Sequence, residues 1–147
     1  MNVVHDVTID LLNPRKNVVH VVQEDSMRTL RLTLLSGCNP FNVAQGADSV
    51  SGVVEYANMK NGYKGSYSET TLGEDAVTLV SGTTNVWLVA LDSMCFKYAG
   101  LTQVNVRFER NDGYLIRSFG VVFDVEQAAG LAIDGEPSLP LYNGEFG

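Results

Sequence analysis

The sequence predicts an all-β protein in which two sheets pack face to face, and three observations lead to this prediction. Apolar and polar residues alternate without interruption over residues 28–34, the pattern of a strand with one buried face. Further alternating stretches follow at spacings of about 8–12 residues, with turn residues between them. Residues 92–100 are the only stretch with helical spacing, and they support one or two turns at most.

The N-terminal third predicts three strands. Residues 4–12 alternate and end at the Asn13-Pro14 turn, residues 18–22 form a short β-branched strand, and residues 28–34 follow a polar turn. Residues 36–40 are rich in turn formers and close the third strand. The side chains expected to face the core are Val7, Ile9, Leu11, Leu30, Leu32 and Leu34.

The middle of the chain predicts one long strand, a weak edge strand and a hairpin. Residues 50–59 form the long strand, in which Gly52 marks a bulge or a close approach. Asn61-Gly62 is a strong turn signal, and residues 67–72 are the weak edge strand. The hairpin consists of residues 76–80 and 85–91.

The C-terminal part predicts a short helical turn and a final hairpin. Asp92 can cap a turn near residues 92–99, which Gly100 ends. Residues 101–110 and 114–125 then form two strands around Asn111-Asp112-Gly113, and Gly120 indicates a bulge or a partner on both faces. The side chains expected to face inward are Val104, Val106, Phe108, Phe119, Val121, Phe123 and Val125, whereas Gln103, Asn105, Arg107 and Glu109 face outward.

Seven to nine short strands in this order indicate an immunoglobulin-like antiparallel β-sandwich, with a β-barrel as the alternative. We assign residues 1–126 to this domain and residues 127–147 to an extended tail. The tail is rich in Gly and Pro but carries many apolar residues, so we expect part of it to pack on a partner. The expected contacts are Leu139, Leu141, Tyr142 and Phe146.

Composition restricts the classes of partner. The 147 residues carry a formal net charge of -7, which disfavours binding to nucleic-acid backbones and to anionic membranes. No apolar run approaches the roughly 18 residues of a membrane span. Because residues 1–6 lack the features of a signal peptide, we expect folding in a cytoplasm.

The residues that could carry chemistry do not form a motif of an enzyme. His5 and His20 are interpreted as structural or surface residues, and Cys95 has no local histidine partner. The acidic pairs Glu24-Asp25, Glu74-Asp75 and Asp124/Glu126 fit calcium binding or a glycosidase weakly, and solvated turns better. We therefore expect no catalytic residue, no cofactor and no metal.

In its order of features, the chain resembles the N-terminal immunoglobulin-like domain of phage and prophage baseplate upper proteins. The similarity lies in residues 8–14, TIDLLNP, in residues 23–34, QEDSMRTLRLTL, and in residues 37–43, GCNPFNV. It continues through residues 88–91, LVAL, the Ala99-Gly100 end of the helical turn and the final hairpin, and covers about residues 4–125. One departure is Lys60-Asn61-Gly62-Tyr63, where family members often carry a Lys-Pro-Asp-Gly-like turn; another is the absence of a long C-terminal region.

The resemblance implies a structural function in the virion. Such a domain docks onto the phage tail baseplate, commonly within a trimer, and supports receptor-binding proteins through the part of the chain on its C-terminal side. The implied partners are other baseplate proteins, and assembly takes place in the bacterial host's cytoplasm.

Two other functions remain open at this point. One is a carbohydrate-binding or adhesin-type immunoglobulin-like module, in which Tyr56, Tyr63 and Tyr67 would form an exposed sugar-stacking cluster, although core packing suits these residues better. The other is a calcium-dependent adhesin or a plain immunoglobulin-like module of a secreted protein.

Overall fold

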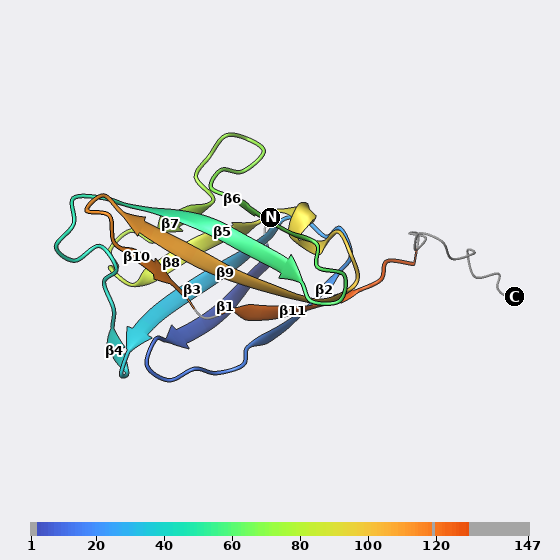
Figure 1. Ribbon diagram of the computed structural model, residues 1–147, viewed down its shortest axis with the longest axis horizontal. Coiled ribbons are helices and arrows are strands. Elements are labelled where there is room, and N and C mark those ends of the chain that lie inside the picture. Colours follow the sequence, from blue (N-terminus) through green and yellow to red (C-terminus); the bar gives the residue numbers. More distant parts are fainter. Residues whose placement is uncertain (1–2, 119, 130–147) are drawn as a thin grey trace, which may run out of the picture.

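The computed structural model describes residues 3–118 and 120–129, which form two packed β-sheets (Figure 1). The first sheet has the strand order β1-β3-β8-β7, with β4 paired to β3. Its strands are β1 (Val3–Asp10), β3 (Arg28–Ser36), β4 (Asn39–Pro40), β7 (Val77–Leu79) and β8 (Val86–Leu91). The second sheet has the order β2-β11-β9-β5-β6, with β10 paired to β9. Its strands are β2 (Val18–Val22), β5 (Val50–Asn58), β6 (Lys64–Tyr67), β9 (Gly100–Arg110), β10 (Leu115–Arg117) and β11 (Val121–Glu126).

The predicted all-β sandwich is confirmed, but its sheets are mixed and not purely antiparallel. β1 runs parallel to β3, and β2 runs parallel to β11. The reason is the connection after β1, which carries the chain from the first sheet into the second. β1 and β2 therefore do not pair as a hairpin, and each joins a strand that runs in its own direction.

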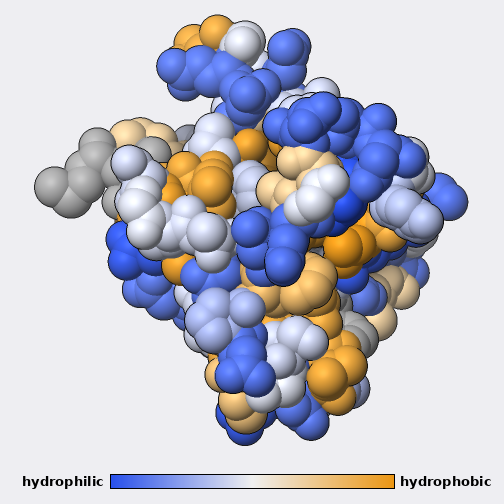
Figure 2. All heavy atoms as spheres, turned by 90° about the vertical axis from the view of Figure 1, so that its left-hand side faces the viewer, coloured by the Kyte–Doolittle hydropathy of each residue, from blue (hydrophilic) through white to orange (hydrophobic). Residues whose placement is uncertain are grey.

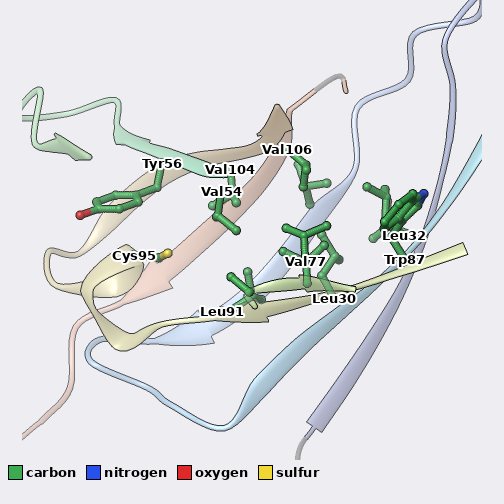
Figure 3. Packing of buried hydrophobic residues seen from close by; sticks show 14 of the residues in the cluster. Leu30, Leu32, Val54, Tyr56, Val77, Trp87, Leu91, Cys95, Val104 and Val106 are labelled. Atoms are coloured by element: carbon green, nitrogen blue, oxygen red, sulfur yellow. The ribbon is translucent and has the colours of Figure 1, made fainter. Parts of the chain in front are cut away.

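The core lies between the sheets and is built by the alternation seen in the sequence. Side chains of Val54, Val104 and Val106 from the second sheet face Leu30 and Leu91 of the first across the core (Figure 3). Each large side chain buried in this way stabilises the fold by about 1.5–3 kcal/mol. The expected inward residues that are buried are Val7, Ile9, Leu30, Leu32, Leu34, Val104, Val106, Phe108, Val121, Phe123 and Val125. Leu11 is partly buried against this core, and Phe119 lies outside the described residues.

Gly52 is a point of close approach between the two sheets. It pairs with Phe108 in a regular register, so the strand has no bulge here. A Cβ atom at residue 52 would lie 2.5 Å from the Cβ of Val77 on the opposite sheet. Only glycine therefore leaves room for β7 at this position.

The final hairpin differs from the single returning strand that was predicted. β10 and β11 both pair with β9, but the register shifts by one residue between the Arg117–Arg107 pair of β10 and the Val121–Val104 pair of β11. This is the β-bulge that Gly120 indicated. At this point the Val106 amide donates its hydrogen bond to the Ser118 Oγ, at 3.0 Å, and not to a backbone carbonyl of the ladder.

Two shorter elements also differ from expectation. The edge strand predicted at residues 67–72 lies at Lys64–Tyr67 instead, where it pairs with β5. The turn expected at residues 36–40 contains β4, because Gly37 and Cys38 both adopt positive φ angles, 59° and 70°, and fold the chain back on β3 as a tight hairpin.

The helical turn is confirmed as a 3₁₀ helix, η1 (Ser93–Phe96). The Asp92 side chain accepts a hydrogen bond from the Met94 amide at 3.0 Å and caps its first turn. Across the described residues, no helix is long and apolar enough to cross a membrane.

Candidate interaction surface

The interface residues predicted from the sequence, Leu139, Leu141, Tyr142 and Phe146, lie outside the described residues. The prediction that the tail forms contacts is therefore untested by the structure. The candidate surface that the structure does describe belongs to the sandwich itself.

Glu55 is the centre of an ion-pair network on the outer face of the second sheet. Its carboxylate accepts hydrogen bonds from Arg107 Nη1 at 2.8 Å, Arg117 Nε at 2.9 Å and Asn105 Nδ2 at 2.8 Å. Glu109 adds a second carboxylate, 3.1 Å from Arg107 Nε. The hydrogen bond from Arg117 is the largest of the effects that hold the pKa of Glu55 below its usual range.

The strands bring these side chains together from distant parts of the sequence. Glu55 lies on β5 directly opposite Asn105 on β9, and Arg117 lies on β10 opposite Arg107. The side chains of Glu55 and Arg107 are only 23% and 24% exposed, so their geometry is held by packing as well as by charge. The result is a fixed pattern of donors and acceptors.

A shallow pocket of about 560 Å³ lies beside this network, over β6, β5 and β9. Glu55 and Lys64 give it both signs of charge, although apolar atoms make up more of its surface than polar ones. The residues that line it are Glu55, Tyr56, Ala57, Lys64, Gly65, Ser66, Gln103 and Asn105. Charged groups beside apolar surface are the usual composition of a protein interface, so this part of the sheet suits a protein partner.

The three tyrosines singled out in the sequence do gather in space, but mainly as packing residues. The rings of Tyr63 and Tyr67 lie 5.8 and 6.2 Å from that of Tyr56, which is only 6% exposed. Tyr56 lies across Gly65, where a Cβ would meet its hydroxyl at less than van der Waals distance. Tyr98 extends the cluster at 4.9 Å from Tyr63, and Lys97 Nζ lies 5.7 Å from the centre of the Tyr63 ring.

The hydroxyl of Tyr67 takes part in hydrogen bonds inside the protein. It donates to the Ala90 carbonyl at 2.7 Å, accepts from the Asp92 amide at 2.9 Å and lies 3.4 Å from Cys95 Sγ. Burial raises the pKa of the Cys95 thiol to about 12, so this thiol stays protonated at neutral pH. Cys38 is exposed, and both cysteines are free.

The acidic pairs and the histidines have separate local roles. Asp25 forms an ion pair with Arg28, and Arg28 Nη1 lies 2.9 Å from His5 Nε2. Burial is the main reason why the pKa of His5 lies below its ordinary value. His20 is exposed and lies 3.6 Å from Asp124. Among the described residues, no three His, Cys, Asp or Glu side chains are grouped so that they could hold a metal ion.

Sequence reasoning identified Asn105, Arg107 and Glu109 as outward residues but missed the residue at their centre. The signal for Glu55 was present, because the inward positions Val54 and Tyr56 flank it. Arg117 could not be found in this way, since its partner Glu55 is 62 residues away in the sequence.

On the end of the sandwich seen in Figure 2, hydrophilic side chains prevail, with patches of hydrophobic ones between them. The exposed large hydrophobic residues include Leu12, Tyr114 and Leu115, and two valines of β2, Val18 and Val22. Such scattered residues are ordinary for a protein surface, but the two valines of β2 lie on one outer strand.

Comparison with solved structures gives an informative match. The fold is similar to that of the N-terminal domain of phage TP901-1 ORF48, with a TM-score of 0.58 and 12% sequence identity, over 84% of this chain and 98% of that one. The chain therefore shares its fold with this phage domain. No family model and no curated protein matches.

Two further solved structures match at lower scores. CopC from Methylosinus trichosporium OB3b has a TM-score of 0.38 and 14% identity, over 80% of this chain and 91% of that one. The ZIG-8-RIG-5 IG1-IG1 heterodimer has a TM-score of 0.30 and 13% identity, over 77% and 84%. At these scores the similarity supports no inference about this chain.

Proposed function

We propose that this chain is a structural protein of a phage tail baseplate, which docks onto the baseplate and supports receptor-binding proteins without catalysing a reaction. The observation that carries the proposal is the shared fold with the N-terminal domain of a phage protein, over nearly all of that domain. The order of sequence features that resembles baseplate upper proteins supports the same function independently.

The outer face of the second sheet is the docking surface that we assign to the sandwich. The network around Glu55 holds Arg107 and Arg117 in place before any partner arrives, which reduces the entropy lost on binding. A polar and preorganised face favours a specific protein partner, because a wrong partner leaves its charges unpaired.

The tail provides the second contact in this proposal. Leu139, Leu141, Tyr142 and Phe146 would pack on a neighbouring subunit or on the receptor-binding protein, and the resemblance favours a trimer in the assembled particle. The protein would be assembled in the bacterial cytoplasm and reside in the virion.

Immunogold electron microscopy on phage particles from the source strain tests the proposal directly. With antibodies raised against this chain, we expect gold at the distal end of the tail, where a baseplate lies. Gold on the capsid, or particles that carry no label while the chain is present in the lysate, would contradict a baseplate function. Particles of a strain deleted for the gene serve as the control.

A glycan-binding module is the alternative, and its own test is a glycan array with the purified chain. Tyr63 is the cluster member to substitute, because Tyr56 is buried and the hydroxyl of Tyr67 is already bonded inside the protein. Binding that Tyr63→Ala abolishes would favour this alternative over the baseplate function.

A further inference from the structure

β2 is an outer strand of the second sheet that carries none of the usual protection of a sheet edge. It pairs with β11 on one side only, and its sequence Val18-Val19-His20-Val21-Val22 contains no lysine, no proline and no bulge. β1 and β2 lie along the same side of the sandwich, opposite β6 and β7 (Figure 1). An unprotected edge of β-branched residues is a template for pairing with another strand.

Two hydrogen bonds show which backbone groups of β2 point outward. The Val122 amide donates to the Asn17 carbonyl at 2.8 Å, and the Gln23 amide donates to the Glu126 carbonyl at 2.7 Å. Odd-numbered residues therefore face β11, and the amides and carbonyls of Val18, His20 and Val22 face the open edge. Of these, the Val22 carbonyl already accepts a hydrogen bond from the Asp25 amide at 3.0 Å.

The sequence around β2 carries positive charge before the strand and negative charge after it, so it is complementary to a second copy that runs in the opposite direction. Arg15-Lys16-Asn17 precedes the strand and Gln23-Glu24-Asp25 follows it, with His20 at the centre. In an antiparallel pair of two copies centred on His20, Val18 lies opposite Val22 of the second copy. β2 ends at Val22, where the chain turns with Glu24 at a φ of 58°, so Lys16 and Glu24 of the second copy flank the ends of the ladder. Asp25 is already paired with Arg28 of its own chain.

We propose that two copies of this chain associate through antiparallel pairing of their β2 strands, centred on His20. The register agrees with the backbone, because the outward residues Val18, His20 and Val22 pair with one another. It forms four hydrogen bonds between the copies without using the occupied Val22 carbonyls: two between the His20 residues and one from each Val22 amide to the opposite Val18 carbonyl.

Charge explains why a second copy fits this edge in an acidic protein. Two copies with a net charge of -7 each repel one another, but the side chains of Val18–Val22 include no carboxylate. Within the described residues, Lys16 and Glu24 have no ion-pair partner and are exposed, so both are available to the second copy. β1, the other outer strand on this side, carries Asp6 and Asp10 and lacks such complementarity.

The size of this interface predicts a weak dimer. A two-stranded ladder of five residues buries less than the roughly 800 Å² per partner of a stable complex. We expect the monomer to convert to the dimer over a protein concentration range of about 10 μM to 1 mM at low salt. The dimer should dissociate as salt is added, because the flanking ion pairs are exposed.

Sedimentation equilibrium of the full chain tests the strand pairing through His20. His20→Pro removes the central outward amide without removing a hydrogen bond to β11, and we expect it to abolish the dimer. The control, His20→Thr, keeps a strand-forming residue and should retain the dimer. Circular dichroism confirms that both variants are folded.

Charge reversal tests the register and does not depend on how proline affects folding. Lys16→Glu and Glu24→Lys each place like charges together at both ends of the ladder, so each variant alone should dimerise about tenfold more weakly at low salt. An equimolar mixture of the two variants should dimerise like the wild type, because opposite charges meet again.

A wild-type chain that stays monomeric to 1 mM overturns the proposal. So does a dimer or trimer that either His20→Pro or the charge-reversed variants leave unchanged. The proposal does not rest on the baseplate function, since immunogold labelling and sedimentation can fail independently.

Discussion

Asp10 shows how a single side chain holds two turns together. Its carboxylate accepts hydrogen bonds from the amides of Leu12, Gly37 and Cys38 at 2.9, 2.9 and 2.7 Å, and from Asn13 Nδ2 at 3.2 Å. The hydrogen bond from Leu12 is the largest of the effects that lower the pKa of Asp10 to about 2. This arrangement fixes the end of β1 against the β3–β4 hairpin.

The ionised state of Asp10 should therefore stabilise the fold in a pH-dependent way. Its pKa falls from 3.8 in the unfolded chain to about 2 in the fold, so its contribution is complete above about pH 4 and is lost as the pH falls to about 2. We expect Asp10→Asn to unfold at lower urea concentration than the wild type at pH 7, with a difference that shrinks between pH 4 and 2. A difference that is constant with pH would contradict the assignment.

Gly52 should be intolerant of even one methyl group. Gly52→Ala places a Cβ within 2.9 Å of three atoms of Val77, so we expect a loss of about 1–3 kcal/mol in the free energy of unfolding. Val77→Gly removes all three of these atoms and should cost less in the Gly52→Ala background than in the wild type. Denaturant unfolding of the four proteins measures this coupling, and additive losses would refute the close approach.

At the scale of elements, Asn58 joins the β5–β6 hairpin to the chain before β9. Its Oδ1 accepts from the amides of Lys60 and Asn61, and its Nδ2 donates to the carbonyls of Tyr98 and Ala99, all within 3.3 Å. The side chain is buried, at 3% exposure. A buried amide that is satisfied on both ends makes the geometry of the two segments mutually dependent.

Replacement of Asn58 should loosen both segments at once. Asn58→Ala leaves two amides and two carbonyls without this partner, and we expect a loss of about 1–3 kcal/mol in the free energy of unfolding. Asn61→Ala is the matched control, because its side chain bonds only the Tyr63 amide in an exposed turn, and it should cost about 0.5 kcal/mol. Equal losses in urea unfolding would show that Asn58 does not link the two segments.

At the scale of the whole molecule, the tail and the sandwich should be separable. A chain that ends at Glu126 loses the hydrogen bond from the Ala128 amide to Gln23 and keeps every strand. We expect its thermal midpoint to fall by about 4 °C or less, while its incorporation into phage particles decreases. A truncated chain that is unfolded would show instead that the tail belongs to the core.

The same truncation separates the two proposed contacts. Pairing through β2 uses residues 15–25 only, so the truncated chain should dimerise as the full chain does. Sedimentation equilibrium of both chains measures this, and a dimer lost on truncation would assign the contact to the tail.

The sequence by itself determined most of the strands and most of the side chains that face the core, but not the position of β6 or the existence of β4. Leu30, Leu32 and Leu34 were identified from alternation because the two faces of a strand follow from local backbone geometry. Gly52 and Gly120 were recognised because each interrupts a regular pattern, but the sequence left two interpretations open at each, and the structure decided for a close approach at Gly52 and a bulge beside Gly120.

Only the tertiary structure decided which strands lie next to one another in each sheet. The parallel pairs β1–β3 and β2–β11, the division of the last strand and the meeting of Glu55 with Arg117 all depend on contacts between residues far apart in the chain. The charge complementarity of residues 15–25 can be read from the sequence, but it can act between two copies only because β2 is an outer strand of its sheet. Local periodicity carries no information about which edges are paired, because pairing is settled by packing of the whole sandwich.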